Sequence, residues 1–432
     1  MELRSRVILG AAPVVTIAGV GLAQTASGSC DDVRASVAET LSDAETRSSL
    51  LAGADSGHDG KFYIAGDDFR LNIRGYMEFR YDLDFRDSSV NADDFTHGFQ
   101  DTRTKLILEG TVNKAWDFWL QGNFDRVTGE ALLEDAYARY NLGNGWKVLW
   151  GQFKLPLLRE EVVFDWNQLA IERSVTNDAY TQKRAQGVQL SHQSDSWRVN
   201  GAFSKGLNSV NTDYAPSSVV GENTSKFIVS GEADWALTGR AEWLLGGDGW
   251  KEFDSFTSDR QSKPGLVWSG AVHVQQSPDT SSPTDVDRTT LEYTSDLNAK
   301  AGPFAFYGAF IGRYSKLSSI AGGSPEYNDF GGVAQAAWSF TAKDEVYGRW
   351  DALFVDAARF SSAGRTNFNF LTVGYNHHFA GNTLVFCAGA IYAFDNTSRL
   401  QTLGVLPDTY PPVTGENARG EVNVVLQFRV LF

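Results

Sequence analysis

Cysteine, methionine and long apolar runs are scarce in this sequence. Two cysteines and two methionines occur among its 432 residues. Cys30 and Cys387 lie far apart, which argues against a disulfide framework. Beyond the N-terminus, no apolar run approaches the roughly 20 residues that a membrane-spanning helix needs, so a helical membrane protein is excluded.

Motifs for catalysis, metal binding and nucleic-acid binding are also missing. No nucleophile motif of the Gly-x-Ser-x-Gly type occurs. The adjacent His377 and His378 would face opposite sides of a strand, which makes them a poor metal pair. The net charge of −15 argues against a nucleic-acid partner. The sequence therefore indicates no catalytic residues, no metal and no cofactor.

Aromatic residues, by contrast, are abundant. They make up 13% of the chain, and hydrophobic residues make up 42%, which is far too apolar for a disordered protein. At the N-terminus, Arg4 and Arg6 precede an apolar stretch at 7–20, and small residues follow it. This pattern predicts a signal peptide over 1–23, cleaved near Ala23, and hence an exported protein.

The segment 24–66 is predicted to be a periplasmic helical or linker segment. Within it, apolar residues recur at helical spacing, which predicts a short amphipathic helix. These residues are Val33, Val37, Leu41 and Ala44. The helix could serve oligomerisation or contact with the cell wall, or it could be a polar leader that folds against the rest of the protein.

From Arg70 onward the apolar residues alternate with polar and charged ones. The chain ends on GEVNVVLQFRVLF, where Phe432, Phe428 and every second residue between and before them are apolar. The positions between them include Arg429, Gln427 and Glu421. Side chains alternate between the two faces of a strand, so one face is apolar and the other largely polar. A single segment of this kind also suits a soluble sandwich.

The whole pattern predicts about sixteen strands. They start near Arg70, Asp101, Ala115, Ala131, Gly145, Ala185, Ser196, Asp234, Pro264, Arg288, Pro303, Asn328, Lys343, Asn367, Asn382 and Gly420. The predicted fold is all-β, a transmembrane antiparallel β-barrel over 67–432. A strand in hydrocarbon must pair all its backbone groups, and only a closed sheet does so.

The connections between the predicted strands alternate in length. Tight links occur at Asn113-Lys114, Gly143-Asn144, Ser194-Asp195, Gly302, Ala342 and Gly381, and long ones at 85–100, 154–184, 206–233, 276–287, 315–327 and 396–419. Outer-membrane barrels have short turns on one rim and long loops on the other, whereas a sandwich has no reason to follow this parity. Two links depart from it, 245–263, which is long, and 126–130, which is brief. The first is either a periplasmic excursion or a wrong boundary.

A barrel of about sixteen strands is wide enough for an aqueous channel, and the polar side chains at alternate strand positions would line it. Cations expected there are Arg70, Arg74, Arg80, Arg103, Lys105, Arg139, Lys147, Arg198, Arg240, Lys300, Arg349 and Arg429. Carboxylates such as Glu78, Asp135 and Glu242 share this face, so pairs across neighbouring strands could neutralise many of the charges. The net charge of the chain says little about the pore, because salt screens charges over about 8 Å.

The link 154–184, the third on the long-loop rim when the brief link 126–130 is counted, is the predicted throat of the channel. It mixes Lys154, Arg159 and Arg173 with apolar residues, among them Leu157 and Phe164. A free external loop needs no such apolar content, whereas a loop folded into the lumen could bury it.

Several motifs resemble the phosphate-selective porin O and P family. They are LEDAYARYNLG (133–143), GQFKLPLLREE (151–161), AIERSV (170–175), RAQGVQL (184–190), GRWDAL (348–353) and TVGYNHHFAGN (372–382). The resemblance implies homotrimeric outer-membrane porins with inward-folded loops and a ladder of basic residues that conducts anions such as phosphate. It would place Lys154, Arg159 and Arg173 in the constriction loop. The C-terminal Phe432 resembles the signal read by the outer-membrane assembly machinery.

Three functions follow as hypotheses. The first is a passive porin in the outer membrane, surrounded by lipid, that passes small inorganic or organic anions. The second is a structural or adhesive barrel plugged by its own loops. The third is an outer-membrane hydrolase, for which the sequence contains no catalytic motif.

Overall fold

The computed structural model describes residues 38–39, 55–86, 95–125, 128–181, 184–209, 211, 233–277, 287–318, 324–405 and 420–432. The predicted signal peptide lies outside these residues. So does the predicted helix at 33–44, apart from Ala38 and Glu39, which are helical. No helix among the described residues is long and apolar enough to cross a membrane.

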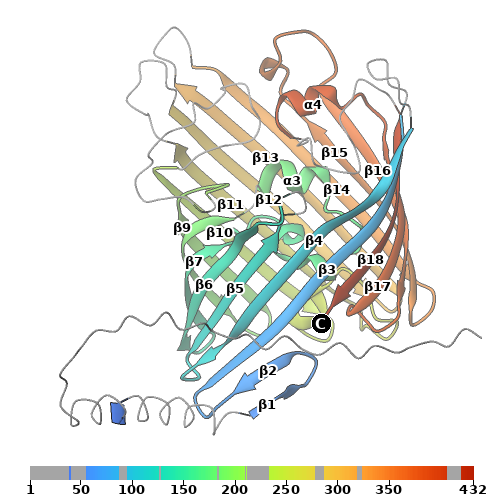
Figure 1. Cartoon of the computed structure of the whole chain (residues 1–432). Helices are drawn as coiled ribbons and strands as arrows, with labels where there is room; N and C mark the ends of the chain where they lie inside the picture. The colour runs from blue at the N-terminus through green and yellow to red at the C-terminus, as the bar shows by residue number, and fades with distance from the viewer. Residues whose placement is uncertain are drawn as a thin grey trace, which may run out of the picture. The chain divides into compact units, whose positions relative to one another are not determined.

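The described chain from Asp55 onward forms one sheet of eighteen strands, of which sixteen close into a barrel (Figure 1). Each strand from β3 to β17 pairs antiparallel with the next, and β18 pairs with β3. The barrel strands are β3 (Phe69–Phe85), β4 (Phe95–Val112), β5 (Trp116–Phe124), β6 (Ala131–Gly143), β7 (Trp146–Phe153), β8 (Ala185–Gln193), β9 (Trp197–Ser204), β10 (Trp235–Gly246), β11 (Gly265–Ser277), β12 (Asp287–Ala301), β13 (Phe304–Ser318), β14 (Glu326–Ser339), β15 (Asp344–Phe354), β16 (Asn367–His378), β17 (Leu384–Ala393) and β18 (Glu421–Leu431). The predicted all-β antiparallel barrel is confirmed.

Most predicted strand starts lie within two residues of the observed ones, and β4 is the clear exception. It begins at Phe95, ahead of the predicted Asp101. The added residues pair with the end of β3, where Phe85 lies opposite Phe95. Polar residues lie between the aromatic ones in this stretch, so its sequence was interpreted as part of a loop.

A short hairpin precedes the barrel and was not predicted. It consists of β1 (Asp55–His58) and β2 (Phe62–Ala65), and β2 pairs with the first residues of β3. Strands of four residues are too short to show an alternating pattern. The segment that the sequence assigned to a helix or linker, 24–66, therefore ends in a hairpin.

The closure of the barrel involves the last residue of the chain. The amide of Gly75 donates to the carbonyl oxygen of Phe432 at 2.8 Å, and the amide of Phe432 donates to that of Gly75 at 3.0 Å. The Phe432 ring lies directly over Gly75, in space that a Cβ atom would need. Closure leaves the sixteen-stranded barrel without an unpaired edge, and glycine at this position lets the Phe432 ring cover the seam.

Aromatic side chains mark the short-turn rim on the outside. Exposed rings near the strand ends at this rim are Trp116, Trp146, Trp197, Trp243, Phe304, Trp338 and Phe340. Membrane barrels carry such aromatic girdles where lipid meets water. The last strand follows the predicted parity, because Leu426 and Phe428 are exposed whereas Val425, Gln427 and Arg429 are buried.

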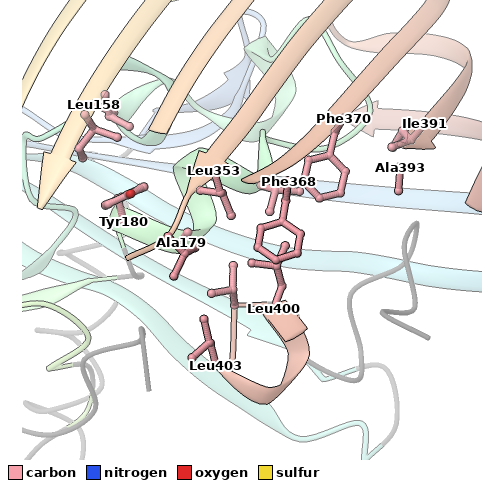
Figure 2. Packing of buried hydrophobic residues seen from close by; sticks show 14 residues of the cluster. Leu158, Ala179, Tyr180, Leu353, Phe368, Phe370, Ile391, Ala393, Leu400 and Leu403 are labelled. Carbon is pink, nitrogen blue, oxygen red and sulfur yellow. The ribbon is translucent and has the colours of Figure 1, made fainter. Parts of the chain in front are cut away.

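One side of the lumen is filled with apolar side chains, which we call the apolar sector (Figure 2). Its members are Leu158, Val175, Ala179, Tyr180, Ile311, Leu353, Val355, Phe368, Phe370, Ile391, Ala393, Leu400, Leu403 and Val405. They come from β13, β15, β16 and β17, from α3 (Val175–Thr181) and from α4 (Ser398–Thr402) with the residues that follow it, and Leu158 and Val355 lie outside these elements. Part of the lumen face of these strands is therefore apolar, where alternation along the strands predicted polar residues.

Candidate functional site in the barrel lumen

Residues 154–184, here called the lumen loop, contact lumen-facing residues of many strands. The loop contains α2 (Arg159–Val162), η1 (Asp165–Asn167) and α3. Arg240 Nη1 donates to the carbonyl oxygen of Leu157 at 2.7 Å, and Thr294 Oγ1 donates to the same oxygen at 3.1 Å. Farther round the wall, Thr176 Oγ1 donates to the carbonyl oxygen of Ala352 of β15 at 3.0 Å, and Arg80 Nη2 of β3 donates to Glu172 Oε1 at 2.5 Å. The loop thus crosses the lumen (Figure 1).

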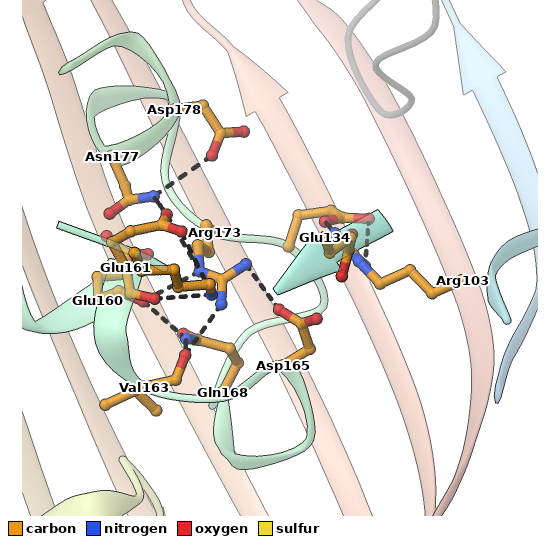
Figure 3. Close-up of polar contacts among 12 residues, drawn as sticks. Arg103, Glu134, Glu160, Glu161, Val163, Asp165, Gln168, Arg173, Asn177 and Asp178 are labelled. Carbon is orange, nitrogen blue, oxygen red and sulfur yellow. Dashed lines mark hydrogen bonds and ion pairs between the residues drawn. The ribbon is translucent and has the colours of Figure 1, made fainter. Parts of the chain in front are cut away.

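Charged side chains hold the middle of the lumen loop (Figure 3). Arg173 Nη1 lies 2.7 Å from Asp165 Oδ1, and its Nε and Nη2 donate to the carbonyl oxygens of Glu160 and Val163 at 3.0 and 2.9 Å. Lys105 of β4 lies 2.6 Å from Asp165 Oδ2. Burial alone would raise the pKa of Asp165, but Lys105 and Arg173 hold that pKa well below its ordinary value.

Two of the cations that the sequence placed on the lumen face, Lys300 and Arg429, donate to backbone carbonyl oxygens. Lys147 lies 3.8 Å from Asp117, and the other twelve cations of the lumen face and the throat each lie within 4 Å of a carboxylate oxygen. The pairs are Arg70–Asp59, Arg74–Glu109, Arg80–Glu172, Arg103–Glu78, Lys105–Asp165, Arg139–Asp117, Lys154–Glu161, Arg159–Glu242, Arg173–Asp165, Arg198–Glu242, Arg240–Asp296 and Arg349–Glu160. The fold therefore distributes these cations among several ion-pair clusters.

The clusters differ in their access to water. The side chains of Arg80, Lys105, Arg159, Arg240 and Arg349 are buried, and they join the lumen loop to the wall or to neighbouring strands. The side chains of Arg70, Arg74, Arg103, Arg139, Lys154, Arg173 and Arg198 keep part of their surface exposed. Only this second group can meet a solute directly.

The link between β10 and β11 (247–264) reaches the lumen loop from the short-turn rim. The amide of Phe256 donates to the carbonyl oxygen of Asn167 at 3.1 Å, and Asn167 Nδ2 donates to that of Asp254 at 3.1 Å. The strand boundaries predicted for this link were correct within two residues. Its length therefore reflects an inward excursion, which contains η2 (Trp250–Asp254).

The ring of Phe256 anchors this β10–β11 link in the lumen. It is 1% exposed and packs with Val163, Leu169 and Tyr307, and its centroid lies 4.8 Å from that of Tyr307. Arg159 Nη1 also donates to the carbonyl oxygen of Phe253 at 3.2 Å. Segments from both rims therefore meet inside the barrel and share one apolar cluster.

A cavity remains open between the lumen loop and the wall formed by β6 to β10. Its volume is about 430 Å³, and we call it the basic cavity. Its lining residues are Arg139, Gly145, Lys147, Lys154, Pro156, Val162, Gln189, Ser191, His192, Gln193, Arg198, Asn200, Arg240 and Glu242. Five cationic side chains thus face one carboxylate.

The cations of the basic cavity include the most accessible ones of the lumen. The side chains of Arg139 and Lys147 are 37% and 38% exposed, and they share a single carboxylate, Asp117. Lys154 lies 3.2 Å from Glu161, outside the spanning strands. Burial, with the charge of Arg173 as the next cause, lowers the pKa of Lys154 to about 8. Its charge is therefore partly lost just above neutral pH.

Sequence reasoning missed three contributors to this site. Glu172 binds both Arg80 and Arg103, at 2.5 and 2.6 Å. Strand alternation could not predict this contact, because Glu172 lies in a long link and not in a strand. Phe256 lies in a link whose aromatic residues and abnormal length were the only available signals. Phe164 was expected to be buried with the other apolar residues of the lumen loop, yet it is exposed. Within the described residues, no group of three or more His, Cys, Asp or Glu residues could hold a metal.

The fold is thus a closed barrel of sixteen strands, with a loop across its lumen and an open charged cavity beside that loop, an architecture typical of porins. Residues 73–226 match the model of the family described as phosphate-selective porin O and P. The match covers less than half of the chain and includes the motifs at 133–143, 151–161, 170–175 and 184–190, which resemble the same family.

Solved structures of porins share this fold at low sequence identity. The anion-selective porin from Comamonas acidovorans matches with a TM-score of 0.60 and 13% identity, covering 84% of this chain and 100% of that one. The outer membrane channel DcaP of Acinetobacter baumannii matches with a TM-score of 0.57 and 12% identity, covering 85% and 99%. OmpT of Vibrio cholerae matches with a TM-score of 0.50 and 12% identity, covering 86% and 100%. The search of curated proteins found no match.

Proposed function

We propose that this porin passes small anions by passive diffusion through the basic cavity. The observation that carries the proposal is the excess of cations in the cavity, five against one carboxylate. A low-dielectric wall focuses the field of such an excess and raises the local concentration of counter-ions. The structural neighbour from Comamonas acidovorans is described as an anion-selective porin, which agrees with this preference.

The ion pairs support diffusion rather than tight binding. Each accessible cation of the cavity already has a carboxylate within 4 Å, so a passing anion competes with that partner. Conduction needs binding that is favourable enough for entry and weak enough for release. Arg139, Lys147, Lys154 and Arg198 would serve as successive weak sites. Inorganic phosphate, which the family description names, is one anion that this arrangement could pass.

The other proposed pore-lining residues have two roles. Arg70, Arg74, Arg103 and Arg173 would contribute to the field along the remaining lumen. Arg80, Lys105, Arg159, Arg240 and Arg349 would position the lumen loop, because they are buried in its ion-pair network. We assign residues 154–184 as the constriction loop on the same contacts.

The cellular context follows from the family and the sequence. We infer export by the predicted signal peptide 1–23, assembly in a Gram-negative outer membrane with Phe432 as part of the assembly signal, and a homotrimer surrounded by lipid. The domain boundaries 24–66 and 67–432 remain proposals, as does the absence of any enzymatic activity.

A barrel plugged by its own loops is the second candidate function. The apolar sector and the meeting of the lumen loop with the β10–β11 link favour it, since both reduce the open cross-section. Single-channel recording on the purified protein in a planar bilayer with a KCl gradient separates the two. A porin that prefers anions gives discrete current steps and a reversal potential of the anion-selective sign. A silent bilayer would support the plug, and a cation-selective reversal potential would reject the anion preference.

A further inference from the structure

Arg198 of β9 is a cation of the basic cavity that is held only by loose ion pairs. The carboxylate oxygens of Glu242 and Asp254 lie 3.9 and 4.0 Å from its Nη1, which is too far for hydrogen bonds. Its Nε has no hydrogen-bond partner among the described residues. Arg240 in the same cavity, by contrast, donates to both carboxylate oxygens of Asp296 at 2.8 Å. An anion in the cavity can therefore accept hydrogen bonds from Arg198 without breaking existing ones.

The ring of Trp250, from η2 of the β10–β11 link, holds this guanidinium in place. The ring centroid lies 4.0 Å from Arg198 Cζ, which is a cation–π contact. The ring itself is fixed, because it is buried, packs with Phe253 and Val267, and donates from Nε1 to the carbonyl oxygen of Ser194 at 2.8 Å. A guanidinium stacked in this way loses little further freedom when it binds an anion. Arg198 thus presents a planar, preorganised set of donors to the cavity.

Three neutral polar residues line the basic cavity beside Arg198, and we call them the polar row. They are Gln189, Ser191 and Asn200, and all three are half-buried. Asn200 follows Arg198 by two positions on β9, and Ser191 of β8 lies opposite Asn200. Gln189 Nε2 donates to Asn200 Oδ1, and Ser191 Oγ donates to the carbonyl oxygen of Lys147, both at 3.4 Å, which is long for a hydrogen bond. The polar row therefore keeps hydrogen-bonding capacity for a solute.

The strand register places the polar row between two cations. Lys147 of β7 lies opposite Ser191, and Arg198 is the diagonal neighbour of Ser191 on the other side. Alternate residues of a strand lie about 7 Å apart, and neighbouring strands lie about 4.8 Å apart. A carboxylate bound to Arg198 therefore has its nearest substituents within reach of Asn200 and Ser191. This spacing suits a short solute with a charge at one end.

We propose that Arg198 and the polar row form a binding site for small carboxylates that carry hydroxyl groups. Lactate is a simple member of this class. The inference rests on the proposed anion channel and names its preferred solutes. The carboxylate of the solute accepts two parallel hydrogen bonds from the Arg198 guanidinium, and its hydroxyl group exchanges hydrogen bonds with Asn200 and Ser191.

The preference for hydroxyl groups follows from the cost of leaving polar groups unpaired. A solute that enters the site displaces water from the polar row. A hydroxyl group replaces the hydrogen bonds of that water, whereas a methyl group leaves the side chains of the row unpaired. The planar guanidinium also matches a carboxylate with two parallel bonds, which a spherical chloride ion cannot accept. A hydroxylated carboxylate should therefore bind more tightly than an apolar carboxylate of equal shape and charge.

The test compares block of the chloride current by lactate and by isobutyrate, in which a methyl group replaces the hydroxyl group. Planar bilayers contain the purified full-length protein. We expect half-block at a lactate concentration about three- to tenfold below that of isobutyrate, as one net hydrogen bond would give. Asn200→Ala and Ser191→Ala should each reduce this ratio towards one, and Arg198→Gln should weaken block by both anions. Ser295→Ala is the matched control, because Ser295 also lies in a strand but is exposed, between the buried Thr294 and Asp296.

Two results would overturn the inference. Equal block by lactate and isobutyrate in the unmodified protein would do so without any variant. A ratio that persists in Asn200→Ala and in Ser191→Ala would show that the hydroxyl group is recognised elsewhere, and either variant decides the point if the other forms no channels. The reversal potential in a KCl gradient is recorded on the same bilayers. Absence of anion preference in the unmodified protein refutes the proposed function itself, whereas anion preference with equal block refutes only the hydroxyl-binding site.

Discussion

The ring of Phe256 should keep the β10–β11 link docked against the lumen loop, and its removal should release that link. Phe256 is almost fully buried among residues from the lumen loop and from the barrel wall. Replacing a buried phenylalanine with alanine costs about 3–5 kcal/mol in lost transfer free energy and cavity formation. The undocked state should therefore become roughly a hundredfold to several thousandfold more populated in Phe256→Ala, since 1.4 kcal/mol corresponds to a factor of ten.

Other contacts oppose this release, and their magnitude sets the expected result. The hydrogen bonds from Phe256, Arg159 and Asn167 join the link to the lumen loop. Each such bond contributes about 0.5–1.5 kcal/mol net. The ring is thus worth about as much as these bonds together. We expect frequent undocking of the link in the variant while the barrel stays folded.

Two assays follow the undocking. Single-channel currents of Phe256→Ala should be larger or noisier than those of the unmodified protein, because part of the cross-section is vacated intermittently. Trypsin should cleave after Arg260 faster, since its guanidinium is held by the carbonyl oxygen of Ser339 in the docked state. Phe304→Ala serves as the control, because Phe304 is exposed on the outside of the same rim. Unchanged current and unchanged cleavage in Phe256→Ala would refute the packing argument.

Three further outcomes are expected. The anion preference should fall as the pH rises through about 8, because Lys154 is charged below this pKa and neutral above it; Lys154→Arg should abolish that pH dependence in reversal-potential measurements. Gly75→Val should block barrel closure, since the valine side chain needs the space of the Phe432 ring. The variant should then lose the heat-modifiable mobility that a folded barrel shows in gel electrophoresis. Gly239→Ala should keep this mobility, because nothing lies within 4 Å of an added Cβ there. Arg139→Gln should shift the reversal potential towards lower anion preference, and a shift in the opposite direction would contradict the role of the cavity cations.

The barrel was predictable from sequence because its rules are local. Alternation fixes which residues face lipid, and turn residues such as Gly302 and Gly381 mark the tight links. Both signals lie within a few residues of each strand, so the sixteen strands and their closure followed from them. The start of β4 was misplaced because the strand extends into a stretch where aromatic and polar residues are mixed.

The lumen was less predictable because its arrangement depends on long-range contacts. Parity placed Arg80 and Arg349 inside the barrel, but it could not tell that Glu172 and Glu160 of the lumen loop would bind them. The inward face near Phe368 is apolar because α3 and α4 pack against it, and the sequence of β16 alone does not predict this packing. Contacts between segments from opposite rims produce no repeating pattern of residue types, so the sequence does not predict them.

Ions that pass the basic cavity should experience its excess positive charge. Lys147→Cys, in a Cys30→Ser background, places a thiol at the most exposed cation of that cavity. The reversal potential in a KCl gradient is then measured before and after reaction with a negatively or a positively charged thiosulfonate reagent. The negative reagent should lower the anion preference, and the positive reagent should restore it. A reversal potential that neither reagent changes would show that ions do not pass the basic cavity.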